Sequence, residues 1–132
     1  MLLALGGIIF FFKFGEFEAM KKGKDGYPGY VIEEYTLEGS VRHFLVADTR
    51  EKQEKGLMFY RSLEGVDGMI FKFPSSNYQV FWNKNTYMDL KLHWINKGQV
   101  IGTSELPSIE KSKDIVTVTS PAEADTVIEI PH

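Results

Sequence analysis

The sequence contains no cysteine among its 132 residues. This absence excludes disulfide bonds, thiolate metal sites, cysteine nucleophiles and a lipid-modified N-terminal cysteine. It does not assign the protein to a compartment, because a chain without thiols is compatible with oxidising and with reducing surroundings.

Histidine is scarce, and recognisable catalytic motifs are missing. The histidines are His43, His93 and His132, and no two of them have the His-x-His or His-x-x-x-His spacing of a zinc site. The serines lack a G-x-S-x-G elbow, and the glycines fit neither a dinucleotide-binding nor a phosphate-binding loop. We therefore expect no metal site, no cofactor and no assignable catalytic residue, which favours a protein that is not an enzyme.

Basic residues form no cluster along the chain. The net charge is −3, so nucleic acid is not an expected partner. Hydrophobic residues make up 43% and charged residues 25% of the sequence, which is ordinary for a globular domain. Aromatic residues reach 14%, and their large side chains can build a dense core in one small domain.

Long hydrophobic runs are absent except at the start, where the residues from Leu2 to Phe12 are apolar. As a helix this run would extend about 16 Å, against about 30 Å of hydrocarbon in a bilayer. It fits the apolar region of a signal peptide, although the lysines, beginning with Lys13, follow the run instead of preceding it. Three interpretations stay open: a targeting segment whose basic residues lie upstream of this sequence, a short uncleaved anchor, or an apolar element of the core.

The sequence therefore divides into three parts. Residues 1–20 form a hydrophobic targeting or anchor segment, the charged and glycine-rich residues 21–29 form a linker, and residues 30–132 form a single domain. We expect membrane contact through the first segment. The expected location is secreted, periplasmic or membrane-anchored, with the cytoplasm left open.

Short stretches of β-branched and aromatic residues, separated by turn signals, fill residues 30–132. One short helix is expected at residues 49–56, because Asp48 and Glu51 have the spacing of a capping box and Gly56 can end a helix. Pro74 is expected to end a strand, and residues 107–114 to form a polar loop. Strands are predicted as a pair within 30–48 and at 68–73, 80–82, 90–95, 99–106, 115–120 and 126–130.

The expected fold is mainly β, or α+β by strict count, with one short helix. No second helical stretch is available to connect parallel strands, so the sheet is predicted to be mostly antiparallel. Closure into a barrel-like sheet would remove its exposed edges. In the strand at 90–95, alternation places Leu90, Leu92 and Trp94 on one face and the residues between them on the other.

Four ordered blocks of the sequence resemble a known family. The blocks "VADTREKQEKGLMFYRSL", "GMIFKF", "FWNKNT" and "SPAEADTVIEI" are together similar to the domain of unknown function 192 family of bacteria and archaea. The resemblance implies a compact, mostly β, barrel-like domain, frequently behind a signal peptide, with no established activity. The matching positions are Asp48, Thr49, Gly56, Leu57, Met58, Arg61, Gly68, Met69, Phe81, Trp82, Lys84, Asn85, Thr86 and Glu129.

Two positions depart from the family pattern. Asn83 stands where the family usually has Met, and Lys91 stands at the usual acid position after Leu90. Asp89 could compensate for the second departure only from the position before Leu90. If the family's site uses that carboxylate, we expect this chain to be altered there.

The stretch "FWNKNTYMDL" holds the best candidate for a binding site. Trp82 could stack on the apolar face of a carbohydrate or another small polar ligand, and Arg61 could contact an anion. The structural alternative is that Asn85 and Thr86 bond to their own turn while Lys84 is solvated. The candidate ligand-binding residues are Arg61, Trp82, Lys84, Asn85, Thr86 and Asp89.

The leading hypothesis is a monomeric, extracytoplasmic or membrane-tethered β-barrel module that binds a small polar ligand or an envelope partner. One alternative is a hydrolase acting on a polar or glycosidic substrate, with Asp48, Asp89 or Glu105 as acid or base. The other is a purely structural domain whose polar residues serve only turns and caps.

Overall fold

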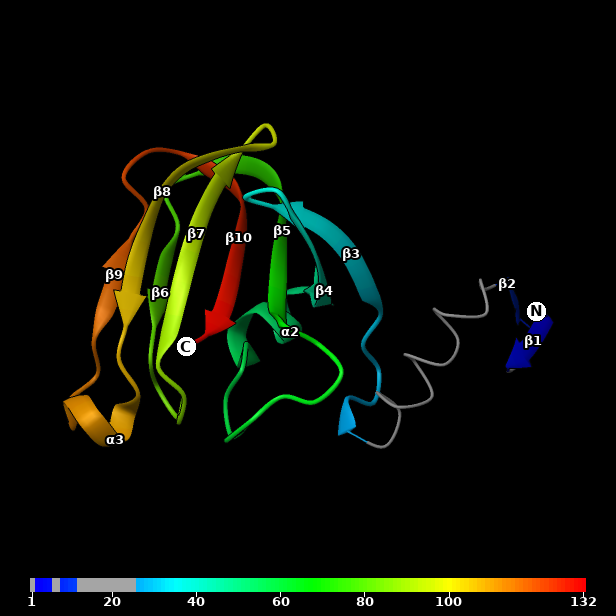
Figure 1. The fold of residues 1–132 in the computed structure, drawn as a ribbon, viewed down its shortest axis with the longest axis horizontal. Coiled ribbons are helices and arrows are strands. Elements are labelled where there is room, and N and C mark those ends of the chain that lie inside the picture. Colours follow the sequence, from blue (N-terminus) through cyan, green and yellow to red (C-terminus); the bar gives the residue numbers. More distant parts are fainter. Residues whose placement is uncertain (1, 6–7, 12–25) are drawn as a thin grey trace.

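A computed structural model describes residues 2–5, 8–11 and 26–132 of the chain (Figure 1). The described strands are β1 (Leu2–Leu5), β2 (Ile8–Phe11), β3 (Ile32–Leu37), β4 (Ser40–Ala47), β5 (Gly68–Asn77), β6 (Val80–Trp82), β7 (Leu90–Asn96), β8 (Gln99–Leu106), β9 (Thr117–Thr119) and β10 (Ala124–Pro131). The described helices are α2 (Arg50–Lys55) and α3 (Ile109–Ser112).

A six-stranded sheet in the order β3-β4-β5-β10-β7-β8 forms the body of the molecule. β4 and β5 are parallel, and every other neighbouring pair in this sheet is antiparallel. The short helix α2 lies in the connection between the two parallel strands. The prediction of a mainly β, mostly antiparallel fold is therefore confirmed.

The sheet is not closed, so the predicted barrel is wrong. β3 and β8 stay at the two edges of the sheet, while β6 pairs with β9 in a separate two-stranded sheet. The last strand, β10, takes both of its neighbours in the middle of the sheet, where it cannot bridge the two edges. Figure 1 shows the small sheet beside β7 and β8. Phe81 of β6 packs on Phe71 of β5 and on Trp94 of β7, so the small sheet covers one face of the large sheet as a second layer.

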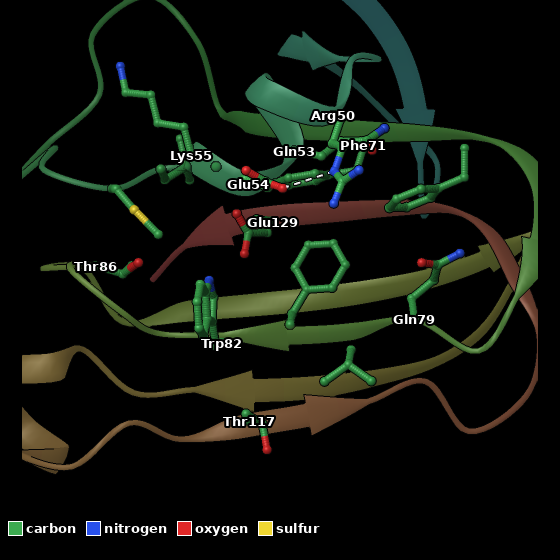
Figure 2. A pocket seen from close by; sticks show the side chains of 16 residues that line it. Arg50, Gln53, Glu54, Lys55, Phe71, Gln79, Trp82, Thr86, Thr117 and Glu129 are labelled. Atoms are coloured by element: carbon green, nitrogen blue, oxygen red, sulfur yellow. Dashed lines mark hydrogen bonds and ion pairs between the residues drawn. The ribbon is translucent and has the colours of Figure 1, made fainter.

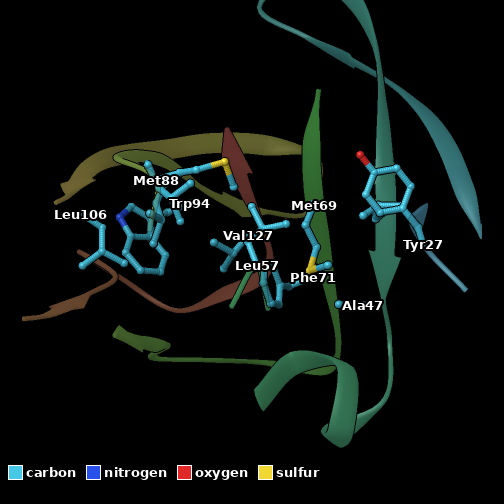
Figure 3. Close-up of a cluster of buried hydrophobic side chains, with 12 residues drawn as sticks. Tyr27, Ala47, Leu57, Met69, Phe71, Met88, Trp94, Leu106 and Val127 are labelled. Atoms are coloured by element: carbon cyan, nitrogen blue, oxygen red, sulfur yellow. The ribbon is translucent and has the colours of Figure 1, made fainter. Parts of the chain in front are cut away.

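The main core lies on the face of the large sheet that the small sheet and α2 cover (Figure 3). The alternation predicted for β7 is confirmed, because Leu90, Leu92 and Trp94 all belong to this core and are at most 1% exposed. The indole of Trp94 donates a hydrogen bond to Oγ of Ser104 at 2.9 Å, which satisfies its polar atom inside the core. Removing these side chains from water supplies the main driving force of folding.

A second, smaller core lies on the opposite face of the sheet. The turn between β3 and β4 closes over this face, and Glu38 in the turn places its carboxylate 2.9 Å from Nε2 of His93 on β7. The hairpin is thereby connected to a strand that is not its neighbour in the sheet. The buried members of this core are Leu37, Phe44, Val46, Ile70, Ile95 and Ile128.

Two helices are present among the described residues, against one predicted. α2 lies where the helix was expected, but its N-cap is Thr49 and not Asp48: the Thr49 hydroxyl accepts a hydrogen bond from the Lys52 amide at 3.3 Å. α3 lies inside the stretch predicted to be a polar loop. Ser108 caps it by accepting a hydrogen bond from the Lys111 amide at 3.2 Å.

The strand β5 continues past Pro74, where the sequence predicts its end. Its pairing with β10 shifts register between Thr126, which faces Lys72, and Ala124, which faces Asn77. A proline is tolerated within this interval because the irregular ladder does not require its missing N–H group.

The N-terminal segment is described only in part. β1 and β2 pair with each other in antiparallel fashion. The rest of the predicted targeting segment, residues 1–20, and most of the predicted linker, residues 21–29, lie outside the described residues. Within the described ranges, no helix has the length and apolar character needed to cross a membrane.

Candidate functional site

A pocket of about 320 Å³ lies between α2, β5, β6 and β10 (Figure 2). It combines an aromatic wall with polar side chains at its rim and one buried acid. Its volume is within the range of pockets that bind small molecules. We call it the aromatic pocket, and its principal residues are Gly56, Phe71, Phe81, Trp82, Thr86 and Glu129.

The wall of the aromatic pocket is held by ring packing. The rings of Phe71 and Phe81 meet edge to face with centroids 4.8 Å apart, and Phe73 meets Phe81 in the same manner at 6.5 Å. Phe81 also packs edge to face on the buried Trp94, with centroids 5.7 Å apart. Because this geometry is favourable and connected to the core, the wall is preformed. Trp82 stands at the opening and is 44% exposed.

Glu129 points from β10 into the space between this strand and β6 (Figure 2). The residue is 4% exposed, and burial raises the pKa of its carboxyl group to about 8, because apolar surroundings penalise the charged form. The group is therefore mostly neutral at pH 7 and can both donate and accept a hydrogen bond. A carboxyl group in this state suits ligand binding or proton transfer.

Two glycines make room around Glu129. Gly56 ends α2 with a φ of 49°, and a Cβ atom there would lie 3.5 Å from Phe71 and 3.7 Å from Oε1 of Glu129. Gly68 begins β5 so close to β10 that a Cβ atom would overlap the carbonyl oxygen of Glu129. These glycines belong to two of the sequence blocks noted above. At both positions, a larger residue would collide with Glu129 or crowd it.

Three of the predicted ligand-binding residues lie at or beside the aromatic pocket. Trp82 and Thr86 line it, and Nζ of Lys84 lies 5.1 Å from the centroid of the Trp82 ring. Asn85 serves the turn, with a φ of 52° and a carbonyl oxygen that accepts a hydrogen bond from the Phe59 amide at 2.9 Å. The hydroxyl of Thr86 donates to the carbonyl oxygen of Lys84 at 3.1 Å, as the structural alternative describes.

Arg61 lines a different hollow, which also contains Asp89 but not Trp82. Its guanidinium group forms an ion pair with Glu110 at 3.0 Å and lies 4.5 Å from the centroid of the Tyr87 ring. The structure therefore brings Arg61 and Asp89 together, but it does not bring them into the aromatic pocket.

Asp89 holds the start of α3. Its carboxylate accepts hydrogen bonds from Nζ of Lys111 at 2.8 Å and from the backbone amide of Ser108 at 2.9 Å. These two groups hold the pKa of Asp89 below its ordinary value. The serine and lysine have the S-x-x-K spacing found in some acyl-transfer enzymes, but here both serve the helix end.

The acids suggested for a hydrolase lie elsewhere than the aromatic pocket. They are Asp48, Asp89 and Glu105. The acids that line the pocket are Glu54 and Glu129, and Glu54 is paired with Arg50 at 3.1 Å on the exposed side of α2. Glu129 is thus the acid of this pocket whose surroundings favour its neutral form.

Sequence reasoning missed the roles of Asn83 and Glu129. Asn83 is fully buried: its Nδ2 donates to the carbonyl oxygen of Pro107 at 2.7 Å and to Oγ of Ser112 at 2.8 Å, while its Oδ1 accepts from the Val116 amide at 2.8 Å. It joins β6 to both ends of the α3 segment. The available signal for Glu129 was a lone acid in the apolar stretch "TVIEI".

The fold and pocket define a small, mainly β domain with a buried acid beside an aromatic wall. The protein-family model described as "Uncharacterized ACR", that of the domain of unknown function 192 family, matches residues 34–132. The chain belongs to this family, as the resemblance of its four blocks predicts. No curated protein matches the chain.

Two solved structures are similar to this chain. One is a Sinorhizobium meliloti protein described as a "putative transcription regulator", with 25% identity, a TM-score of 0.59, and coverage of 76% of this chain and 78% of that one. The other is a Novosphingobium aromaticivorans protein of unknown function, with 24% identity, a TM-score of 0.63, and coverage of 77% and 73%. The second likeness supports the fold alone.

Proposed function

We propose that this protein binds a small molecule in the aromatic pocket. An apolar part of the ligand packs against Phe81 and Trp82, and a polar group forms hydrogen bonds with Glu129. The observation that carries the proposal is a buried, mostly neutral carboxyl group that lines an aromatic pocket. Burial of a carboxyl group costs folding free energy unless it is hydrogen-bonded, and a ligand supplies such a bond.

The polar rim narrows the class of ligand. Gln53, Gln79 and Thr117 line the same pocket. Nε2 of each glutamine already donates to backbone carbonyl oxygens, so the two side chains offer mainly their Oε1 acceptors, and Thr117 offers a hydroxyl group. A compact, uncharged molecule with one flat apolar face and several hydroxyl or amide groups fits these features, which includes sugars and aromatic metabolites. The proposed ligand is therefore still a small polar molecule or a carbohydrate, as the sequence suggested. The proposed site now includes Glu129 and no longer includes Arg61.

A fragment screen by nuclear magnetic resonance tests this proposal on the full chain. A library of small sugars, phenols and amides is titrated into wild-type protein and into Trp82→Ala and Glu129→Gln. We expect fragments that shift the resonances of pocket residues, with affinity at least tenfold lower in both variants, because each variant removes one half of the recognition.

Tyr78→Ala is the matched control, because Tyr78 is an aromatic residue that is 62% exposed and does not line the pocket. Its affinity for the same fragments should equal that of the wild type. The proposal fails if no fragment shifts pocket resonances, or if Trp82→Ala, shown by circular dichroism to be folded, binds every hit as well as wild type does.

A hydrolase is the second candidate function, and the pKa of Glu129 favours it. A carboxyl group with a pKa of about 8 is protonated at neutral pH and can act as a general acid. Chromogenic glycosides and esters would then be cleaved at a rate that falls as pH rises through about 8, and Glu129→Gln would abolish the cleavage. If the wild-type protein binds ligands but cleaves none of these substrates, the hydrolase function is excluded and the binding function remains.

The proposed location is extracytoplasmic or membrane-tethered. The apolar run from Leu2 to Phe12 supports this part of the proposal. Fractionation of cells that express the intact chain, beside a chain lacking residues 1–24, tests it. Recovery of the intact chain in the membrane or extracytoplasmic fraction, and of the truncated chain in the cytoplasm, is the expected result; a cytoplasmic location for both would contradict it.

A further inference from the structure

We propose that a second site binds a phosphate- or sulfate-type oxyanion between Arg42, Lys91 and His93. The site is a hollow of about 240 Å³ over Ile130 of β10, between the β3–β4 hairpin and β7. Lys91 and His93 alternate along β7 with Leu90, Leu92 and Trp94, so the hollow is on the opposite face of the sheet from the main core and the aromatic pocket.

Two buried polar atoms of this hollow lack hydrogen-bond partners among the described residues. They are Nε of Arg42 and Nδ1 of His93. His93 is 4% exposed, and both side chains line the hollow. Buried polar atoms normally have partners. Nε of Arg42 is a donor, and Nδ1 of His93 becomes one when its ring is protonated, so an oxyanion can then accept hydrogen bonds from both groups at once.

The hollow contains two cationic side chains, Arg42 and Lys91, that are without ion pairs among the described residues. Burial is the main cause that lowers the pKa of the His93 ring; Glu38 opposes it, and Lys91 and Arg42 add smaller contributions in the lowering direction. Once His93 is protonated, an anion between the three groups would offset their positive charges. The phosphate group of a larger molecule would satisfy the same contacts as the free ion.

Acidic groups near the hollow make this binding depend on pH. The Glu38 carboxylate lies 2.9 Å from Nε2 of His93 and favours the tautomer with its proton on that atom. Glu105 faces Lys91 across the β7–β8 ladder and pairs with His132. With neutral histidines, the two acids offset the two permanent cations. Nδ1 of His93 carries a proton only when the ring is cationic, so an anion that bonds to Nδ1 binds together with a proton.

Sulfate is the probe, because its charge stays constant between pH 5.5 and pH 8. It is titrated into the full chain, and amide resonances are followed, with sodium chloride at matched ionic strength as the salt control. We expect saturable binding at one site, with an affinity at pH 5.5 at least tenfold higher than at pH 7.5, since one bound proton allows up to about tenfold per pH unit.

Variants distinguish sulfate binding at this site from a general effect of salt on the protein. Arg42→Gln and Lys91→Gln should each lower the sulfate affinity at least tenfold. His93→Gln should remove most of the pH dependence, and the double variant His93→Gln with His132→Gln should remove the rest, because His132 also lines the hollow. Arg50→Gln is the matched arginine control, because its side chain is 92% exposed on α2, and its sulfate affinity should be unchanged. Non-saturable shifts equal to those in chloride, or unchanged affinity in the folded Lys91→Gln variant, would overturn the proposal. Glu129→Gln should not alter sulfate binding, so a failure of this site and a failure of the aromatic pocket are distinguishable.

Discussion

Glu129 is buried on β10 beside aromatic rings, and its surroundings decide its chemistry. A carboxyl group with an ordinary pKa of 4.5 is charged at neutral pH, whereas burial raises the pKa of Glu129 to about 8. Between these two pH values the folded state binds one more proton than the unfolded state. The stabilising contribution of the neutral acid is therefore complete below about pH 4.5 and is lost as pH rises through about 8.

Glu129→Gln should remove this pH dependence. Relative to the variant, the free energy of unfolding of wild type should fall by up to about 1.4 kcal/mol per pH unit within that window, as one extra proton is lost on unfolding. Urea denaturation of both proteins at pH 5, 6, 7 and 8 measures the difference. A difference that stays constant over this range would show that Glu129 has an ordinary pKa.

Asn83 holds three partners inside the fold, and Asn83→Ala should remove all three hydrogen bonds. We expect a loss of about 3 kcal/mol in the free energy of unfolding, at about 1 kcal/mol for each bond. The control is Asn77→Ala, because Asn77 is exposed and bonds through Nδ2 to Oγ of Ser75 alone; its effect should stay within about 0.5 kcal/mol. Equal losses in the two variants, measured by thermal denaturation, would contradict the role of Asn83.

At the scale of elements, the pair of β5 and β10 positions the candidate site. β10 carries Glu129, and β5 carries Phe71 of the pocket wall. The two strands approach so closely at Gly68 that no side chain fits there. The glycine of the "GMIF" block is therefore explained by the separation of two strands and not by a turn.

Gly68→Ala should force β5 and β10 apart. The new methyl group would overlap backbone atoms of Glu129, which cannot move without breaking the ladder, and we expect a loss of about 3 kcal/mol in the free energy of unfolding. Gly26→Ala is the control, because no described atom beyond its chain neighbours lies within 4 Å of the added group, and its stability should remain near that of wild type. Chemical denaturation compares them; a tolerated Gly68→Ala would contradict the close approach.

Elements that depend on neighbouring residues in the sequence could be predicted, whereas elements that depend on contacts between distant residues could not. The strand at 90–95 was predicted with its core-facing residues correct, because the alternation of apolar and other side chains is visible in neighbouring residues of the sequence. α3 was missed, because a four-residue helix has no periodic apolar stripe and depends on the cap at Ser108 and on Asp89 from a distant strand end. β5 passes Pro74 because of a register shift that only its partner strand reveals.

At the scale of the whole molecule, two layers and two cores replace the predicted barrel. The sequence indicates how many apolar strands exist, but not that β10 lies in the middle of the sheet. The same limit affects the site. Trp82 and Thr86 could be proposed because they are near each other in the chain, whereas Arg61 and Glu129 could be placed only from the spatial arrangement of strands.

The two tryptophans report on this layered arrangement. Trp94→Phe leaves Trp82, which is 44% exposed, so its fluorescence should be red-shifted and readily quenched by acrylamide. Trp82→Phe leaves Trp94, which is 0% exposed, so its emission should be blue-shifted and protected from the quencher. Equal quenching in the two variants would contradict the placement of β6 at the surface and of β7 against the core.

The pKa of Glu129 can be measured directly, and its value tests whether the aromatic pocket holds a buried, neutral acid. Carbon-13 resonances of the glutamate carboxyl groups are followed from pH 4 to pH 10 on the intact chain, and Glu129→Gln assigns the signal. We expect a midpoint of about 8 for Glu129. A midpoint near the ordinary value of 4.5 would show that the carboxyl group is solvated and charged at neutral pH, and it would contradict the proposed pocket.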